Sequence, residues 1–296
     1  MYNLVILGCE NSHANTILKV LKQEGLDTEF KVIGIYSEEK EAAEKLNADY
    51  GVEIMENFDD AVDKVDGVII TARHGDNHYK YAKPYLTSKV PMFIDKPITA
   101  NLKDGIEFMN ELKALGIRVN GGSIIPHEPE AQEIKRIKES GEMGRVQGGN
   151  LIFPWLDDPN YGGFWFYTQH LAQNLLEVFG QDVKAVSALK AGTTVSVVAQ
   201  YPEFTVTGTF LKKSVGYYTE IYCENGRKSL LHELSADTVY RDTKGEVLEF
   251  LDLVKGGEMK ESYEDFFRPV FLLDAMQKAY ETNQVIEVLD PASFLK

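Results

Sequence analysis

The sequence has little cysteine, few basic residues and no long apolar run. Cys9 and Cys223 are the two cysteines of the chain, and their spacing matches no metal-ligand pattern. We therefore expect a reducing compartment, the cytoplasm, with no disulfide and no metal site. Lys and Arg total 31 against 46 Asp and Glu, which gives a net charge of -15. Because this charge repels phosphate groups, neither nucleic acid nor an anionic membrane is an expected partner.

No apolar stretch approaches the roughly 20 residues that a membrane-spanning helix needs. The first apolar run has no basic segment before it, so it predicts a buried strand and not a signal peptide. The rest of the composition is ordinary for a globular protein, with 44% hydrophobic and 26% charged residues. A chain of 296 residues is long enough for two domains with separate cores.

The first part of the chain alternates short apolar runs with helical patterns. The expected strands are residues 4–7, 31–36, 52–55, 67–71, 92–95 and 117–120. A helix follows Ser12, and further helices are expected near residues 38–48, 58–65, 77–88 and 102–115. This alternation predicts a doubly wound parallel sheet, in which ligands bind beyond the carboxyl ends of the strands.

After about residue 122 the pattern changes. Helices are expected near residues 128–140 and 166–179, and a strand near 146–153. Five β-rich runs then follow without helices between them, at residues 183–190, 194–201, 204–211, 217–223 and 228–233. They predict a large, mostly antiparallel open sheet. Two more helices, near 247–255 and 263–282, close the chain.

We therefore expect an α/β protein of two domains. Residues 1–122 would form the doubly wound domain, and residues 123–296 an α+β domain for substrate binding and oligomerisation. The C-terminal helix is expected to pack back on the first domain.

The loop after the first strand begins at Gly8. A dinucleotide-binding loop has a second glycine two residues later, because its backbone approaches the pyrophosphate closely. Glu10 holds that place here, followed by Asn11 and Ser12. The helix N-terminus still supplies amide donors, and Ser12 can cap it. The loop fits either an atypical dinucleotide loop or a plain turn between strand and helix.

The second expected strand ends at Ser37 and Glu38, where an acidic residue would hold the adenosine ribose. If Glu38 takes that role, its charge disfavours the 2′-phosphate of NADP. In the alternative interpretation, which we favour slightly, Ser37 caps the next helix and Glu38 complements its dipole.

Three polar residues, Arg73, His74 and His78, follow the fourth expected strand, at an edge where ligands bind. Arg73 contacts a substrate anion or pairs with Asp76. His78 faces the ligand or is a satisfied histidine at a helix start, which is the commoner fate of a lone histidine.

Asp95-Lys96-Pro97 ends the fifth expected strand and is the sharpest local feature. A lysine at this edge points into the cleft, and burial lowers its pKa, which suits proton transfer with a substrate hydroxyl. The alternative is a surface lysine paired with Asp95. His170 follows a glycine pair and an aromatic cluster, which indicates a wall facing the substrate or simply a packed aromatic helix face.

Taken together, these features resemble the Gfo/Idh/MocA oxidoreductase family over nearly the whole chain. Asp95-Lys96-Pro97 is similar to its Glu-Lys-Pro signature. Gly162-Gly163 through His170 is similar to its glycine-rich helix that ends in a catalytic histidine. The resemblance implies a Rossmann domain and a second domain with a large open sheet, through which the chain would form a homodimer or homotetramer.

The resemblance implies that Lys96 transfers the proton and His170 binds the substrate. The residues that we expect to bind NAD or NADP are Gly8, Glu10, Asn11, Ser12, Ser37, Thr71, Arg73, His78, Asp95 and Lys96. Those that we expect to contact the substrate are His74, Trp165, Tyr167 and Gln173.

Four positions depart from the family pattern. Glu10 replaces a loop glycine, and Ser37 replaces the ribose-binding acid. Phe166 and Gln173 stand where the family has carboxylates, four residues before the histidine and three after it. The usual hydroxyl-binding network therefore cannot form unchanged, and the candidate neutral replacements are Tyr167, Gln169 and Gln173.

The sequence thus predicts hydride transfer between a nicotinamide cofactor and a secondary alcohol of a sugar- or polyol-like substrate. Two alternatives stay open. One is a relative that retains NAD and uses transient oxidation to drive elimination or glycoside cleavage. The other is a non-catalytic member that binds a nucleotide or sugar and regulates a partner.

Overall fold

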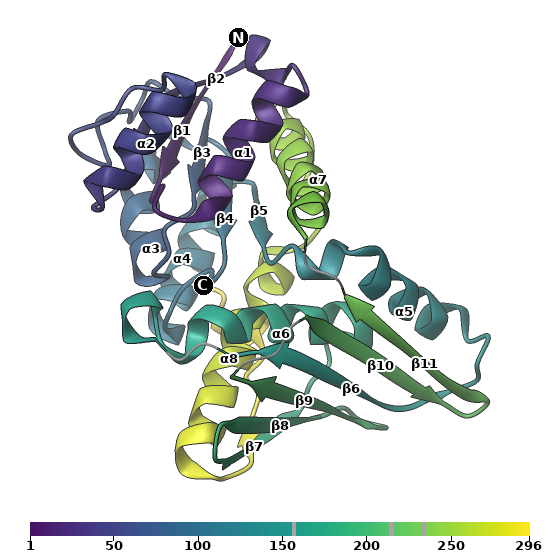
Figure 1. Cartoon of the computed structure of the whole chain (residues 1–296). Coiled ribbons are helices and arrows are strands. Elements are labelled where there is room, and N and C mark those ends of the chain that lie inside the picture. Colours follow the sequence, from purple (N-terminus) through teal and green to yellow (C-terminus); the bar gives the residue numbers. More distant parts are fainter. Residues whose placement is uncertain (156–157, 213–215, 233–234) are drawn as a thin grey trace.

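The computed structural model describes residues 1–155, 158–212, 216–232 and 235–296, which form two sheets with helices around them (Figure 1). The N-terminal sheet is parallel throughout, with strand order β2-β1-β3-β4-β5. Its strands are β1 (Tyr2–Leu7), β2 (Phe30–Tyr36), β3 (Gly67–Ile70), β4 (Met92–Asp95) and β5 (Val119–Gly122). The predicted doubly wound sheet is confirmed.

Helices cover both faces of this sheet, and the side chains of β1 show why its sequence is apolar at successive positions. Leu4 and Ile6 belong to one hydrophobic core, whereas Val5 and Leu7 belong to the other. Because successive side chains of a strand point to opposite faces, a strand covered on both sides needs an unbroken apolar run. The helices of this region are α1 (Ser12–Gln23), α2 (Lys40–Tyr50), α3 (Asp76–Ala82) and α4 (Leu102–Leu115).

Two elements expected between β2 and β3 are absent. Residues 52–55 do not form a strand, because the segment makes one bridge, between Ile54 and Ile35, and then leaves the sheet. Residues 58–65 form turns instead of a helix. The sheet therefore has five strands where six were predicted.

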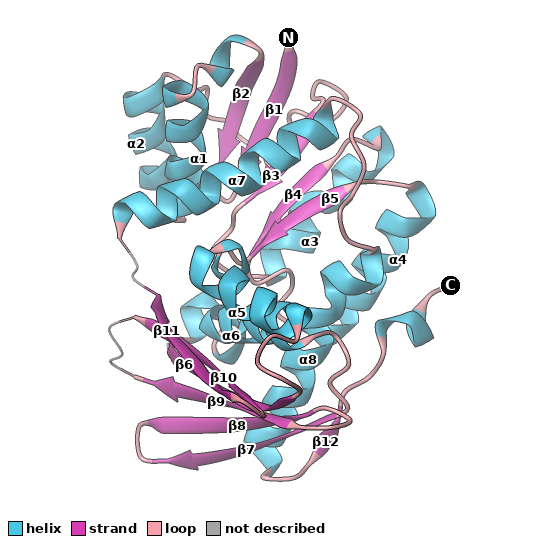
Figure 2. Cartoon of the chain, turned by 90° about the vertical axis from the view of Figure 1, so that its right-hand side faces the viewer, coloured by secondary structure: helices cyan, strands magenta, loops and turns pink. Residues whose placement is uncertain are grey.

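The C-terminal sheet has seven strands in the order β11-β10-β6-β9-β8-β7-β12 (Figure 2). Its strands are β6 (Val146–Pro154), β7 (Ala185–Ala191), β8 (Thr194–Gln200), β9 (Thr205–Leu211), β10 (Tyr217–Cys223), β11 (Gly226–His232) and β12 (Ile286–Glu287). Neighbouring strands are antiparallel except for β6 and β9. The predicted mostly antiparallel sheet is confirmed. Helices α5 (Pro129–Ser140) and α6 (Phe164–Phe179) lie between this sheet and the N-terminal one.

The last two long helices pack back on the N-terminal domain. Helix α7 (Ala236–Val254) adds Val247, Phe250 and Leu251 to the core that contains Leu4. It begins eleven residues before the expected start, at a capping box formed by Ser235. Helix α8 (Tyr263–Thr282) contacts α4 and β7. None of the helices in the described parts of the chain is both long and apolar enough to cross a membrane.

The strand order places one junction at the centre of the N-terminal sheet. β1 has β2 on one side and β3 on the other. The connection after β1 therefore leads to one edge of the sheet, whereas the strands from β3 onward continue toward the other edge. The loops that follow β1 and β3 therefore diverge at their carboxyl ends and leave a crevice, which is where open α/β sheets bind ligands.

Candidate active site

The first loop of the crevice starts at Gly8, which has a φ of +79°. A Cβ at this position would lie 2.3 Å from the Cα of Ala72, so the close approach of the two loops requires glycine. The next residues cap helix α1, whose N-cap is Asn11 and not Ser12 as expected. The Asn11 side chain accepts a hydrogen bond from the backbone N–H of His13, whereas Ser12 already has helical backbone.

Glu10 turns its carboxylate toward the ends of the neighbouring strands. It accepts one hydrogen bond from Ser37 Oγ at 2.7 Å and another from the backbone N–H of Arg73 at 2.8 Å. A carboxylate is therefore held beside the end of β2, where the sequence has serine in place of the ribose-binding acid. Ser37 also accepts a hydrogen bond from the backbone N–H of Glu39, next to the start of α2.

Arg73 closes this part of the crevice. Its guanidinium donates to the backbone oxygen of Glu10, pairs with Glu39 at 3.2 Å and lies 5.0 Å from the ring centroid of Tyr161. The alternative in which it pairs with Asp76 is wrong, because the loop directs the side chain across the crevice. A cavity of about 390 Å³ lies here, lined by Glu10, Glu38, Glu39, Arg73, His74, Asp76, Asn77, Tyr81 and Asn160.

Asp95 is buried at the end of β4 and ties three segments together. It accepts hydrogen bonds from the Asn11 side-chain amide at 3.1 Å and from the backbone N–H of Lys96 at 2.7 Å, and it pairs with His13 Nδ1 at 2.8 Å. Burial alone would raise the pKa of Asp95, but His13 and the Lys96 ammonium outweigh it and lower the pKa. Asp95 therefore stays charged and orients its neighbours.

Lys96 is 4% exposed, so the surface-lysine interpretation is wrong. Its amino group lies 3.8 Å from the ring centroid of Phe166 and 5.7 Å from that of Tyr167. Burial lowers its pKa from 10.5 to about 8, with Asp95 opposing the shift and Arg73 adding to it. An amine with this pKa exchanges a proton readily near neutral pH.

His170 reaches the same space from helix α6. Its Nδ1 lies 2.7 Å from Ser123 Oγ, and the ring is buried. Burial, with the positive charges of Lys96 and His13, holds the pKa of His170 well below its usual value. The imidazole is therefore neutral and can either donate or accept a hydrogen bond.

These groups surround a cavity of about 470 Å³. Its wall combines the α1 N-terminus, the β3 and β4 ends, helix α6 and strand β10, which are brought together from both domains. The lining residues are Asn11, Ser12, His13, Arg73, Lys96, Ile124, Ile125, Tyr161, Phe166, Tyr167, His170, Tyr217 and Val239. The cavity therefore offers an amine, a neutral imidazole and a helix N-terminus to one ligand.

Other expected site residues lie outside this space. Thr71 donates to the backbone oxygen of Gly8, and His78 bonds the backbone oxygen of Ala72 at 2.7 Å, both fully buried beneath the loops. Trp165 donates to Gln277 of α8, because it lies on a different face of α6 from His170. Gln173 accepts hydrogen bonds from the backbone N–H of Ser123, which follows β5, and from the side chain of Gln169, one turn earlier on α6.

Gln169 is likewise committed, since its side-chain oxygen accepts a hydrogen bond from the backbone of Ile98. Of the three candidate neutral replacements, Tyr167 is the one that lines the cavity. The sequence interpretation also missed His13, Ser123, Tyr161 and Tyr217. Ser123 carried a usable signal, because it directly follows the carboxyl end of a strand, whereas the two tyrosines come from segments that only the fold brings here.

One group of side chains has the spacing of a metal site within the described residues. Glu128, Glu130 and His232 place ligand atoms within 4.8 Å of one another. Both ring nitrogens of His232 already have partners, Glu128 at 2.5 Å and Thr219 at 3.0 Å. None of these residues lines the cavity at Lys96.

Comparison with known proteins agrees with this geometry. Residues 2–122 match the Gfo/Idh/MocA model, described as an oxidoreductase family with an NAD-binding Rossmann fold. The N-terminal domain is therefore similar in sequence to the NAD-binding domain of that family. The parallel sheet formed by these residues is consistent with the Rossmann fold that the family description names. A search of curated proteins finds no match.

Solved structures of similar fold extend the likeness over the second domain. Scyllo-inositol dehydrogenase from Lactobacillus casei, with NAD(H) and scyllo-inositol, has a TM-score of 0.83 at 15% identity, covering 97% of this chain and 99% of its own. Myo-inositol 2-dehydrogenase from Lactobacillus plantarum has a TM-score of 0.84 at 14% identity, with coverage of 97% and 99%. The WlbA dehydrogenase from Chromobacterium violaceum, with NADH and UDP-GlcNAcA, has a TM-score of 0.78 at 15% identity, covering 97% of this chain and 96% of its own.

Proposed function

We propose that this Gfo/Idh/MocA protein is an NAD-dependent dehydrogenase that oxidises a secondary alcohol of a sugar- or polyol-like substrate. The observation that carries the proposal is the convergence of Lys96 and His170 on one cavity beside the α1 N-terminus. The structural likeness to inositol and sugar-nucleotide dehydrogenases supports the substrate class. Residues 1–122 would be the cofactor domain and residues 123–296 the substrate domain.

The residues of the crevice are compatible with a bound dinucleotide, although the contact to its ribose differs from the family pattern. The N-terminus of α1 and the Arg73 guanidinium supply positive potential for the pyrophosphate. Glu10 is positioned by Ser37 and Arg73 to accept hydrogen bonds from the adenosine ribose, which compensates for the serine at position 37. Four carboxylates line the neighbouring cavity, from Glu10, Glu38, Glu39 and Asp76. This charge disfavours a 2′-phosphate, so we propose NAD over NADP.

In this proposal His170 orients the substrate hydroxyl and Lys96 accepts its proton. Ser123 Oγ accepts the backbone N–H of Ile125, so its own proton is free for Nδ1 of His170. The Nε2 proton of His170 can then donate to the hydroxyl oxygen and orient it. The neutral amine of Lys96 takes the hydroxyl proton. The nicotinamide, when bound, supplies the hydride acceptor.

The decisive experiment is turnover of a panel of inositols, aldoses and uronic acids with NAD, followed by nicotinamide absorbance. The expected result is activity on at least one secondary alcohol that Lys96→Ala lowers by at least about a hundredfold. NADH fluorescence should show nearly unchanged cofactor affinity in that variant. Turnover that survives Lys96→Ala would refute the proton-transfer role.

A second candidate is a non-catalytic member that binds the cofactor and a sugar. The observation in its favour is Phe166, whose ring lies against the Lys96 amino group where the family has a carboxylate. NADH binding without turnover on any panel member would favour it.

We also propose that the chain forms a homodimer or homotetramer through the C-terminal sheet. Val197 packs near Gly208 and Leu171 on the side of α6, so the adjacent Ser196 and Val198 face away from that helix and are partly exposed. Light scattering after size-exclusion chromatography tests this, and a monomeric mass would contradict it.

A further inference from the structure

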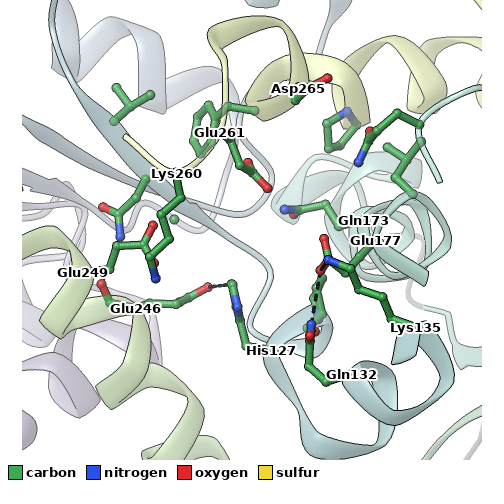
Figure 3. A pocket seen from close by; sticks show the side chains of 18 residues that line it. His127, Gln132, Lys135, Gln173, Glu177, Glu246, Glu249, Lys260, Glu261 and Asp265 are labelled. Atoms are coloured by element: carbon green, nitrogen blue, oxygen red, sulfur yellow. Dashed lines mark hydrogen bonds and ion pairs between the residues drawn. The ribbon is translucent and has the colours of Figure 1, made fainter. Parts of the chain in front are cut away.

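A second cavity of about 380 Å³ lies on another side of helix α6 (Figure 3). It is enclosed by β5, α5, α6, α7 and the start of α8, and it shares no lining residue with the cavity at Lys96. Charged and amide side chains from these elements point toward a common space, as the close view shows. The proposed dehydrogenase chemistry uses none of them.

Glu246 is the most constrained group of this cavity. Its residue is 5% exposed, and its Oε1 accepts no hydrogen bond. His127 Nε2 stands 3.6 Å away, beyond hydrogen-bonding distance. The ion pair with His127 is therefore too long to donate a hydrogen bond to Oε1 (Figure 3). Burial raises the pKa of Glu246 well above its usual value, and the charges of Asp95, Glu249 and Asp242 add to the shift. A buried acceptor without a donor costs about 1–3 kcal/mol.

Asn120 of β5 presents a second unsatisfied acceptor. The residue is 6% exposed, and its side-chain amide donates to the backbone oxygen of Glu246 at 2.9 Å. That bond fixes which end of the amide carries the oxygen. The remaining atom, Oδ1, is buried and has no hydrogen-bond partner, and Asn120 is one of the residues that line the cavity. Two buried acceptors from adjacent elements at this cavity therefore lack a hydrogen-bond donor within reach.

Carboxyl groups outnumber lysines in the lining of this cavity. Lys135 pairs with Glu177 at 2.7 Å, and Lys260 pairs with Glu249 at 2.5 Å. Asp265 at the rim pairs with Arg268, which lies outside the lining. Among the residues that the structure describes, the other two carboxylates of the lining, Glu246 and Glu261, have no ion pair with a lysine or arginine.

We propose that this cavity is a binding site for a small organic cation that carries a primary ammonium group. An ammonium has three donors and no acceptor, which matches Glu246 Oε1 and Asn120 Oδ1. Burial raises the pKa of Glu246 well above its usual value and that of Glu261 to about 7, and the charge of the ligand would favour the ionised form of both carboxyls. A metal ion fits less well, because the tight ligand group found among the described residues lies elsewhere, at Glu128, Glu130 and His232. This inference does not depend on the proposed dehydrogenase activity.

The test is isothermal titration calorimetry with 1,4-diaminobutane at physiological ionic strength, with 1,4-butanediol as the neutral analogue. We expect saturable binding of one diamine and no binding of the diol. Glu246→Gln keeps the size of the side chain but removes its charge, and it should weaken binding at least about tenfold. The matched control is Glu44→Gln, which removes an exposed carboxylate of α2 and should bind like the wild type.

Two further variants keep the result interpretable. Asn120→Ala should weaken diamine binding severalfold. This variant tests the site if circular dichroism shows that Glu246→Gln does not fold. Lys96→Ala should bind the diamine normally even though it stops turnover, which separates this site from the proposed function. Absence of binding, equal binding by Glu246→Gln, equal binding of the diol, or displacement of the diamine by Mg²⁺ would each overturn the proposal.

Discussion

Replacing Phe166 by aspartate tests how the cavity sets the proton affinity of Lys96. In the structure the ring centroid lies 3.8 Å from the amino group, and burial lowers the pKa of Lys96 to about 8. Aspartate would place a carboxylate at a similar separation. Two unit charges about 4 Å apart attract by about 4 kcal/mol at an effective dielectric constant of about 20.

The loss of the aromatic ring removes up to about 2 kcal/mol of cation–π stabilisation of the ammonium. The net gain of about 2 kcal/mol for the charged form corresponds to an increase of between about one and two pKa units, since one unit is about 1.36 kcal/mol. Phe166→Asn provides the matched control, because it also removes the ring and has the same size but carries no charge.

The assay is the pH titration of the ¹³Cε chemical shift of Lys96 in protein labelled at lysine, assigned with Lys96→Arg. The expected midpoint is about 8 in the wild type, with the asparagine variant at or below that value. The aspartate variant should titrate between one and two units higher, and its turnover should need correspondingly higher pH. A midpoint in Phe166→Asp at or below that of Phe166→Asn would refute the reasoning.

Four other perturbations follow from the same geometry. The pKa of Lys96 is lowered from 10.5 to about 8 by burial. The charged ammonium therefore lowers the free energy of unfolding by about 3 kcal/mol at pH values below about 8, and this effect disappears as the pH rises from about 8 to 10.5. Lys96→Met should therefore raise the free energy of unfolding by up to about 3 kcal/mol at neutral pH and by little at high pH in urea denaturation, whereas an equal gain at both would contradict the cause. Ser123→Ala removes the partner of His170 and should lower kcat about fivefold to tenfold with less effect on KM, and unchanged steady-state kinetics would exclude a positioning role. Glu10→Gln should weaken NADH binding about tenfold and lower the preference over NADPH in fluorescence titrations, and a constant ratio of the two affinities would argue against Glu10 as the ribose acid. Gly8→Ala should lower the free energy of unfolding by at least about 2 kcal/mol, and an unchanged Tm would show that the two loops can separate.

Local sequence patterns were sufficient for most elements. The bounds predicted for residues 102–115 and 263–282 agree with helices α4 and α8, because amphipathic periodicity of that length has few alternatives. The first half of α7 escaped prediction, since its residues are largely polar. Several of them are nevertheless buried, including Asp242 and Glu246, because the helix packs against β5. Burial of polar residues depends on distant partners, which local periodicity does not contain.

Patterns along the chain were enough to predict the parallel sheet, the open second sheet and the family resemblance carried by Asp95-Lys96-Pro97. The tertiary structure decided which polar groups meet. It turned Glu10 toward Ser37 and Arg73, and it left two acceptors facing the cavity beside α6. The physical reason is that alternation and periodicity follow from neighbours along the chain, whereas the partner of a side chain depends on its angle around a helix and on segments far away in sequence.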